Sequence, residues 1–317
     1  MPRRGDPEDV LGAPYRAETI ALPDDGEGPV VATLVHCAAG TEPSRRAVLH
    51  VHGFADYFFQ TVAADHWVSR GYDFYALDLR KYGRSLLPHQ TPNYVTDLGT
   101  YYEELDLAWQ RVRARHEQVV LSAHSTGGLT VPLWADDRDA DPAALVLNSP
   151  WLDMQGDPFT RRVAMPAIHR LGARRPQRIV PRRVSGLYAR SLHRDHEGEW
   201  DFDLAWKPLR SWPVYAGWIR AIRTAQARVA RGLGLDVPVL TLCSARSSHP
   251  KSAVDPDLHR TDTVLDVEQI RRRAPLLSRH STVVQVEGAM HDVTLSPAPA
   301  RARVFDEIDR FLAAYVD

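Results

Sequence analysis

The fold of this chain is constrained most by residues 119–128, which read Val-Val-Leu-Ser-Ala-His-Ser-Thr-Gly-Gly. Residues 119–121 suit a buried strand, and the apolar run at 129–134 suits the start of a helix. A strand that turns sharply into a helix with serine at the apex is a nucleophile elbow, usually written G-x-S-x-G. Small residues are needed beside the serine because the strained turn brings strand and helix close together. Ser125 would be that serine, with Ala123 in place of the first glycine, and the rest of the chain must support the hypothesis.

Hydrophobic patterning on both sides of this stretch predicts strands that alternate with helices. Strands are expected at 15–22, 30–37, 47–51, 72–78, 119–121, 144–148, 237–243 and 282–286, the first two as a hairpin. Helices are expected at about 58–71, 98–115, 214–231 and 300–315, and from residues 129 and 267 onward. Such alternation indicates a mainly parallel sheet with helices on both faces, so the predicted fold class is α/β.

The alternation stops after Pro150 and resumes near residue 214. Residues 151–212 show no clean strand period and are rich in proline and arginine. We therefore expect 1–150 and 213–317 to form the two parts of one core, with 151–212 inserted after the sixth strand. Insertions at the carboxyl edge of such a sheet lie over the place where ligands bind, so this one is predicted to be a lid.

Composition narrows the class of protein. The chain is 44% hydrophobic and 25% charged, with a net charge of −1, which indicates a globular protein and argues against general nucleic-acid binding. The first nine residues do not resemble a signal peptide, and no run approaches the roughly 18 apolar residues of a transmembrane segment. Cys37 and Cys243 lie in apolar segments and are expected to be reduced thiols of a cytoplasmic protein. No metal-ligand spacing or dinucleotide fingerprint is visible, so we expect no metal and no cofactor.

A serine nucleophile requires a histidine to take its proton and a carboxylate to orient that histidine. After an elbow these follow in the order serine, acid, histidine. His291 is the favoured base because it ends a small-residue loop after the strand at 282–286. The other downstream histidines are less suitably placed, in the insertion, in a polar loop or before a strand: His169, His193, His196, His249, His259 and His280.

The acid is expected in the long loop that follows the strand at 237–243. Asp262 is preferred, with Asp255 and Asp266 as alternatives. Asp266 directly precedes a helical run and suits the role of helix N-cap, which leaves Asp262 as the better acid.

Two backbone N–H groups should stabilise the oxyanion, one from Thr126 and one from Phe54 in the first strand-to-helix loop. Gly53 lets that loop approach the substrate closely. Five residues in all are predicted to contact the substrate: His52, Gly53, His124, Trp151 and Trp218.

Several short motifs together resemble one known family. They are His52-Gly53, the Asp-Leu-Arg-Lys-Tyr-Gly-Arg-Ser run at 78–85, the Ser125 elbow, Asn148-Ser149-Pro150, Asp262…Asp266 and Gly288…His291-Asp292. Over nearly all of 30–315 except the insertion, the chain is similar to α/β-hydrolases of the monoacylglycerol lipase, lysophospholipase and serine aminopeptidase-like branch. The resemblance implies a serine hydrolase with a lid after the sixth strand, Ser125 as nucleophile, Asp262 as acid and His291 as base. The chain departs from the family at Ala123, usually glycine, at Thr126, often methionine, and in its long 244–262 loop.

The expected activity is hydrolysis of a carboxylic ester, either lipid-like or a small acyl ester. Acyl transfer, peptidase chemistry on the same residues and a catalytically silent binding scaffold are the alternatives. Residues 158–194 contain ten arginines and no Asp or Glu. This surface is either a solvated face of the lid or a contact for anionic lipid or an anionic substrate.

Overall fold

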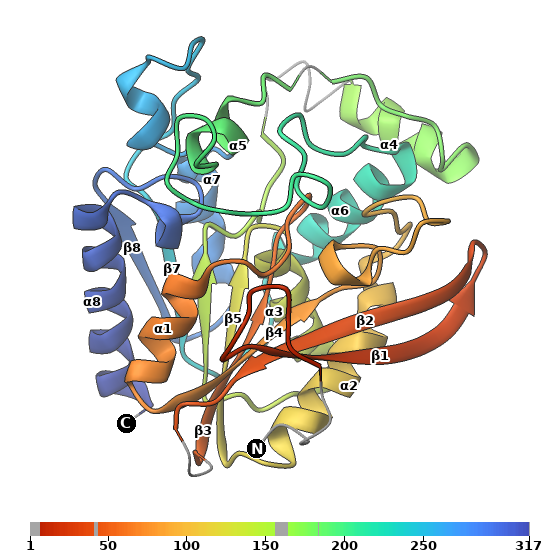
Figure 1. The fold of residues 1–317 in the computed structure, drawn as a ribbon. Coiled ribbons are helices and arrows are strands. Elements are labelled where there is room, and N and C mark those ends of the chain that lie inside the picture. The colour runs from red at the N-terminus through yellow and green to blue at the C-terminus, as the bar shows by residue number, and fades with distance from the viewer. Residues whose placement is uncertain (1–6, 41–43, 156–163, 183, 317) are drawn as a thin grey trace.

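The structure, a computed structural model, describes residues 7–40, 44–155, 164–182 and 184–316 (Figure 1). In this part of the chain eight strands form one sheet in the order β1-β2-β4-β3-β5-β6-β7-β8. β2 is antiparallel to both of its neighbours and all other pairs are parallel. The strands are β1 (Arg16–Asp25), β2 (Gly28–Cys37), β3 (Arg46–Val51), β4 (Tyr72–Asp78), β5 (Gln118–His124), β6 (Ala144–Asn148), β7 (Val239–Ser244) and β8 (Ser281–Val286).

Helices cover both faces of the sheet, because side chains along each strand alternate between two hydrophobic clusters. Leu121 of β5 packs in the cluster that contains helices α2 (Tyr102–Arg113), α3 (Gly127–Arg138) and α6 (Ala216–Val229). Val120 packs in the opposite cluster, with α1 (Thr61–Ser69) and α8 (Ala298–Tyr315). The predicted α/β class with a mainly parallel sheet is therefore confirmed.

Most predicted elements lie within two residues of their observed ends, but one helix begins later than the pattern indicated. The apolar spacing predicted a helix from about residue 58, whereas α1 begins at Thr61. The backbone N–H of Phe58 instead donates to the Asp78 carboxylate, 2.9 Å away, which holds residue 58 in the preceding loop. The helix predicted from residue 98 starts with a 3₁₀ turn, Leu98–Tyr101, capped by Asp97.

The segment 151–212, between β6 and α6, contains in its described part the helices α4 (Met165–Arg174) and α5 (Leu187–Leu192). In Figure 1 it lies beyond the end of the sheet where α4 and α5 are labelled. A buried ion pair joins it to the core, with Lys207 Nζ 2.8 Å from Asp56 Oδ1. The domain limits at 150/151 and 212/213 stay a prediction.

Three smaller features complete the fold. The helix predicted from residue 267 is short, α7 (Val267–Arg273). Cys37 and Cys243 are buried free thiols. None of the helices in the described ranges is long and apolar enough to cross a membrane.

Candidate active site

Ser125 occupies a strained turn between β5 and α3. Its φ is +51°, a left-handed conformation that is unfavourable for residues other than glycine. The turn is possible because Gly127 has no side chain: a Cβ there would lie 2.4 Å from the carbonyl oxygen of His52. Ala123 is fully buried in β5, where its methyl group contributes to the core. The apex presents the Ser125 side chain at the carboxyl edge of the sheet.

A continuous hydrogen-bonded chain runs from this serine to a histidine and an aspartate. His291 Nε2 lies 3.1 Å from Ser125 Oγ, and His291 Nδ1 lies 2.9 Å from Asp262 Oδ2. Because a carboxylate only accepts, Nδ1 carries the proton and Nε2 is free to accept from the serine hydroxyl. All three side chains are buried. This geometry suits proton transfer from Ser125 to His291.

Backbone N–H groups fix the carboxylate of Asp262. Its Oδ1 accepts from the amides of Val264 and Leu265 at 2.8 and 2.7 Å, which leaves Oδ2 to face His291. The two alternatives have other roles. Asp266 accepts from the Glu268 amide and caps α7, and Asp255 accepts from the Asp257 amide at a 3₁₀ turn.

The loop that carries His291 is held by residues for which the sequence predicted no role. Asp292 accepts hydrogen bonds from Asn148 Nδ2 at 2.6 Å and Gln60 Nε2 at 3.2 Å. Burial acts to raise the pKa of Asp292, but the positive charge available on His124 and hydrogen bonds from Thr294 and Asn148 outweigh it, and the pKa is lowered. The charged carboxylate thus anchors the loop from the side opposite Asp262.

Two neighbours of the His291 ring come from elsewhere in the chain. Tyr188, on α5, accepts a hydrogen bond from the Asp292 amide and packs its ring edge-on at 5.6 Å from His291. The His124 ring lies 4.9 Å from that of His291, and burial lowers the pKa of His124. Only the position of Asp292, directly after the histidine, could have signalled this support from the sequence.

Two backbone amides beside Ser125 are available to a ligand. Phe54 and Thr126 both line the cavity above the serine, and within the described ranges neither amide donates a hydrogen bond to another residue. Gly53 permits the close approach, since a Cβ there would lie 3.0 Å from the Ser125 Cβ. Both predicted oxyanion donors therefore lie at the same cavity as the serine.

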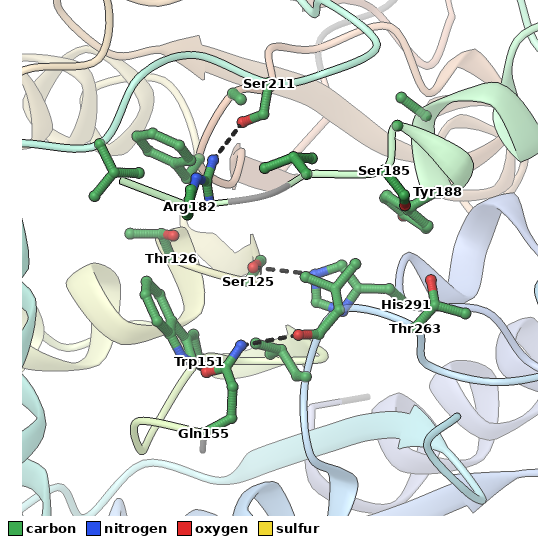
Figure 2. Close-up of a pocket in the computed structure, with 18 of the residues that line it drawn as sticks. Ser125, Thr126, Trp151, Gln155, Arg182, Ser185, Tyr188, Ser211, Thr263 and His291 are labelled. Atoms are coloured by element: carbon green, nitrogen blue, oxygen red, sulfur yellow. Dashed lines mark hydrogen bonds between the residues drawn. The ribbon is translucent and has the colours of Figure 1, made fainter. Parts of the chain in front are cut away.

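The cavity has a volume of about 730 Å³ and opens over Ser125 (Figure 2). Its wall includes three of the five residues predicted to contact substrate, His124, Trp151 and Trp218. The rings of Phe54 and Trp218 pack at 4.3 Å, and those of Trp151 and Trp218 at 5.7 Å, which makes this side aromatic. The 151–212 segment supplies further wall residues, among them Met165, Ile168, Val180, Arg182, Ser185, Tyr188 and Ser211.

The other two residues predicted to contact substrate, His52 and Gly53, are not part of the cavity wall. His52 Nδ1 lies 2.8 Å from the Gly53 carbonyl oxygen, and its Nε2 accepts from the Leu79 amide at 3.0 Å. The His52 ring therefore holds the loop in which Phe54 lies.

Asp56 is the one carboxylate among the described residues of the cavity wall. Burial acts to raise the pKa of Asp56, but the charge and hydrogen bond of the neighbouring Lys207 ammonium, together with smaller electrostatic contributions, outweigh burial and lower the pKa to about 2. This pair is therefore ionised, and its two charges offset one another.

Comparisons with known proteins show the family and the fold of this chain. A family model described as "Serine aminopeptidase, S33" matches residues 42–295. The monoglyceride lipase of Saccharomyces cerevisiae, solved with a substrate analogue, is similar with a TM-score of 0.69 at 15% identity, over 95% of this chain and 97% of that one. The monoacylglycerol lipase of Paleococcus ferrophilus has a TM-score of 0.64 at 19% identity, over 88% and 98% of the two chains.

A third similar structure is Est1E from Butyrivibrio proteoclasticus with bound ferulic acid. Its TM-score is 0.58 at 14% identity, over 94% of this chain and 99% of that one. No curated protein sequence matches this chain significantly. At these identities the solved structures show a shared α/β-hydrolase fold.

Proposed function

This chain belongs to the serine aminopeptidase S33 family of α/β-hydrolases, and from that membership and its site geometry we propose that it hydrolyses carboxylic esters. One observation carries the proposal: the hydrogen-bonded chain from Ser125 through His291 to Asp262 lies at a 730 Å³ cavity. In this proposal Ser125 is the nucleophile, His291 the general base and Asp262 the residue that orients the imidazole.

The proposed mechanism has two half-reactions. Ser125 Oγ attacks the ester carbonyl carbon while His291 Nε2 takes the hydroxyl proton, and the amides of Phe54 and Thr126 stabilise the oxyanion. His291 then protonates the departing alcohol, which leaves the acyl group on Ser125. Water, deprotonated by His291, releases the acid and restores the serine. An oxyanion donor of this kind typically contributes a rate factor on the order of 10²–10³.

The proposed substrate is an ester with a single acyl chain or a small aryl-acyl group. The aromatic wall of Phe54, Trp151 and Trp218 and the apolar side chains of α4 support this class, because apolar burial favours an acyl chain. Two of the similar structures are monoacylglycerol lipases by their names, and a third holds ferulic acid.

The family description favours a second candidate, removal of an amino-terminal residue from a peptide. Recognition of an α-ammonium group requires a free carboxylate at the site. In the described part of the cavity wall the one carboxylate, Asp56, is already paired with Lys207. The charge arrangement therefore supports ester hydrolysis over aminopeptidase activity.

A panel of 4-nitrophenyl esters of increasing acyl length, set beside aminoacyl 4-nitroanilides, tests the proposal. We expect turnover of the esters, a preferred chain length, and a loss of at least about 10³-fold in kcat for Ser125→Ala. Turnover of the aminoacyl amides alone would overturn the ester assignment. Folded protein that turns over neither class would favour acyl transfer or a silent scaffold.

Contact with anionic lipid through the arginine-rich stretch and a cytoplasmic location remain predictions. Part of that stretch, residues 158–163 and 183, lies outside the described residues. Its described arginines on α4 include Arg170 and Arg174, which are exposed. Tighter binding to anionic than to neutral vesicles, reversed by salt, is the result expected of a lipid contact.

A further inference from the structure

Arg182 is a cation in the wall of the cavity that contains Ser125, and it is also exposed to solvent. Its guanidinium is held by neutral groups: Nη2 donates to Ser211 Oγ at 2.8 Å and to the Trp212 carbonyl oxygen at 3.3 Å. It also lies over the Phe54 ring, 5.6 Å from the ring centroid. Figure 2 shows it above Thr126 and Ser125, on the side away from His291. These contacts fix its position close to the proposed oxyanion hole.

The charge of Arg182 has no counter-charge within the described part of the chain. No described carboxylate forms an ion pair with Arg182. Lys207, a second cationic side chain in the cavity wall, differs in this respect because it is paired with Asp56. A guanidinium remains protonated in proteins, so the positive charge of Arg182 is permanent. Among described residues, Nε and Nη1 have no acceptor, so two donors remain for a ligand.

We propose that Arg182 binds an anionic group of the substrate, a carboxylate or a phosphate, and so makes this enzyme selective for negatively charged esters. The inference rests on the ester hydrolysis proposed above. A planar guanidinium with two free N–H donors matches the two oxygens of a carboxylate or phosphate. Exposed arginines on the described part of the same segment, among them Arg170, Arg174 and Arg178, add positive charge that attracts anions.

A purely structural role for Arg182 predicts something different. In that role the side chain would contact Phe54 and Ser211 only to hold the loop that contains Phe54 against the 151–212 segment. Its loss would then lower turnover of neutral and anionic esters alike. A binding role lowers turnover of the anionic ester selectively.

Two matched substrate pairs separate these roles and locate the anionic group. Mono-4-nitrophenyl adipate and 4-nitrophenyl hexanoate differ in a carboxylate at the end of the acyl chain. 1-Hexanoylglycerol 3-phosphate and 1-hexanoylglycerol differ in a phosphate on the alcohol side. Arg182→Gln removes the charge, Arg182→Lys keeps it without the planar fork, and Arg178→Gln is the control. Arg178 is exposed on the same segment and is not part of the cavity wall.

In one of the two pairs we expect the wild-type enzyme to prefer the anionic substrate. Arg182→Gln should lower kcat/KM for that anionic substrate about 10- to 100-fold, mainly through a higher KM. Turnover of the neutral member should stay within about threefold, Arg182→Lys should be intermediate, and Arg178→Gln should resemble wild type. Equal losses for both members, or no anionic preference in either pair, would overturn the proposal.

A binding measurement keeps this test independent of turnover. Hexyl phosphate or adipate should bind to the Ser125→Ala protein in calorimetry, and should lose at least tenfold in affinity when Arg182→Gln is added. Binding without turnover by the wild type would contradict ester hydrolysis but support the Arg182 site. Equal binding with and without the Arg182 guanidinium would contradict the site alone.

Discussion

Asp262 and Asp266 lie four residues apart, yet only Asp262 faces His291. The sequence left both open, together with Asp255, because the 244–262 loop has no periodic pattern that reveals its path. In the structure the end of this loop lies beside its start. The Asp262 amide donates to the Arg246 carbonyl oxygen, and the backbones of Asp262 and Ser247 form an isolated β-bridge. The acid therefore lies beside the end of β7 despite the long excursion. Such a return depends on long-range contacts that spacing cannot show.

A pair of isosteric substitutions tests this difference at single residues. Asp262→Asn should lower kcat on the order of 10³–10⁴-fold with little change in KM, because an amide no longer fixes the Nδ1–H tautomer of His291. Asp266→Asn preserves a good helix cap, so its activity should stay near wild type. Steady-state kinetics on one 4-nitrophenyl ester measures both. The reverse ranking of the two variants would reject Asp262 as the acid.

At the scale of elements, the elbow was readable from the sequence because its constraint is local. Small residues at 123, 127 and 128 are required where β5, α3 and the β3 loop meet, and the chain supplies Ala, Gly and Gly. The observed packing explains why alanine is accepted at position 123, where its methyl group is fully buried among apolar neighbours. At Gly127 there is no space for a methyl group. The family's usual glycine at 123 is thus not a steric requirement of this chain.

Gly127→Ala should destabilise the elbow strongly. The new methyl group would lie 2.4 Å and 2.6 Å from the carbonyl oxygens of His52 and Val51, so α3 must shift. We expect the free energy of unfolding to fall by at least about 2 kcal/mol, with ester turnover reduced even where the protein is folded. Urea denaturation with circular dichroism, together with the ester assay, measures both effects.

Gly26→Ala is the matched control for this substitution. Gly26 lies in the β1–β2 turn, and no atom lies within 4 Å of the position that an alanine methyl group would take there. Stability should therefore stay within about 0.5 kcal/mol of wild type. A Gly127→Ala protein as stable and active as the Gly26→Ala protein would contradict the steric account of the elbow.

At the scale of the whole molecule, the sheet order brings together residues from 54 to 291. β3, β5, β7 and β8 all run parallel, so the loops after them meet at one edge and carry Phe54, Ser125, Asp262 and His291. The alternating pattern predicted this class of sheet. It could not predict what the irregular 151–212 segment contributes, since Tyr188, Arg182 and Lys207 reach the site through contacts without periodic spacing.

The central claim is that Ser125 is a nucleophile activated by His291 and oriented on this fold. Reaction with a fluorophosphonate, followed by mass spectrometry of the digested protein, tests it most directly. We predict one covalent adduct, on the peptide that contains Ser125, absent from Ser125→Ala and formed at least about 10²-fold more slowly in His291→Ala. A folded wild-type protein that forms no adduct, or forms it on another residue, would contradict this claim.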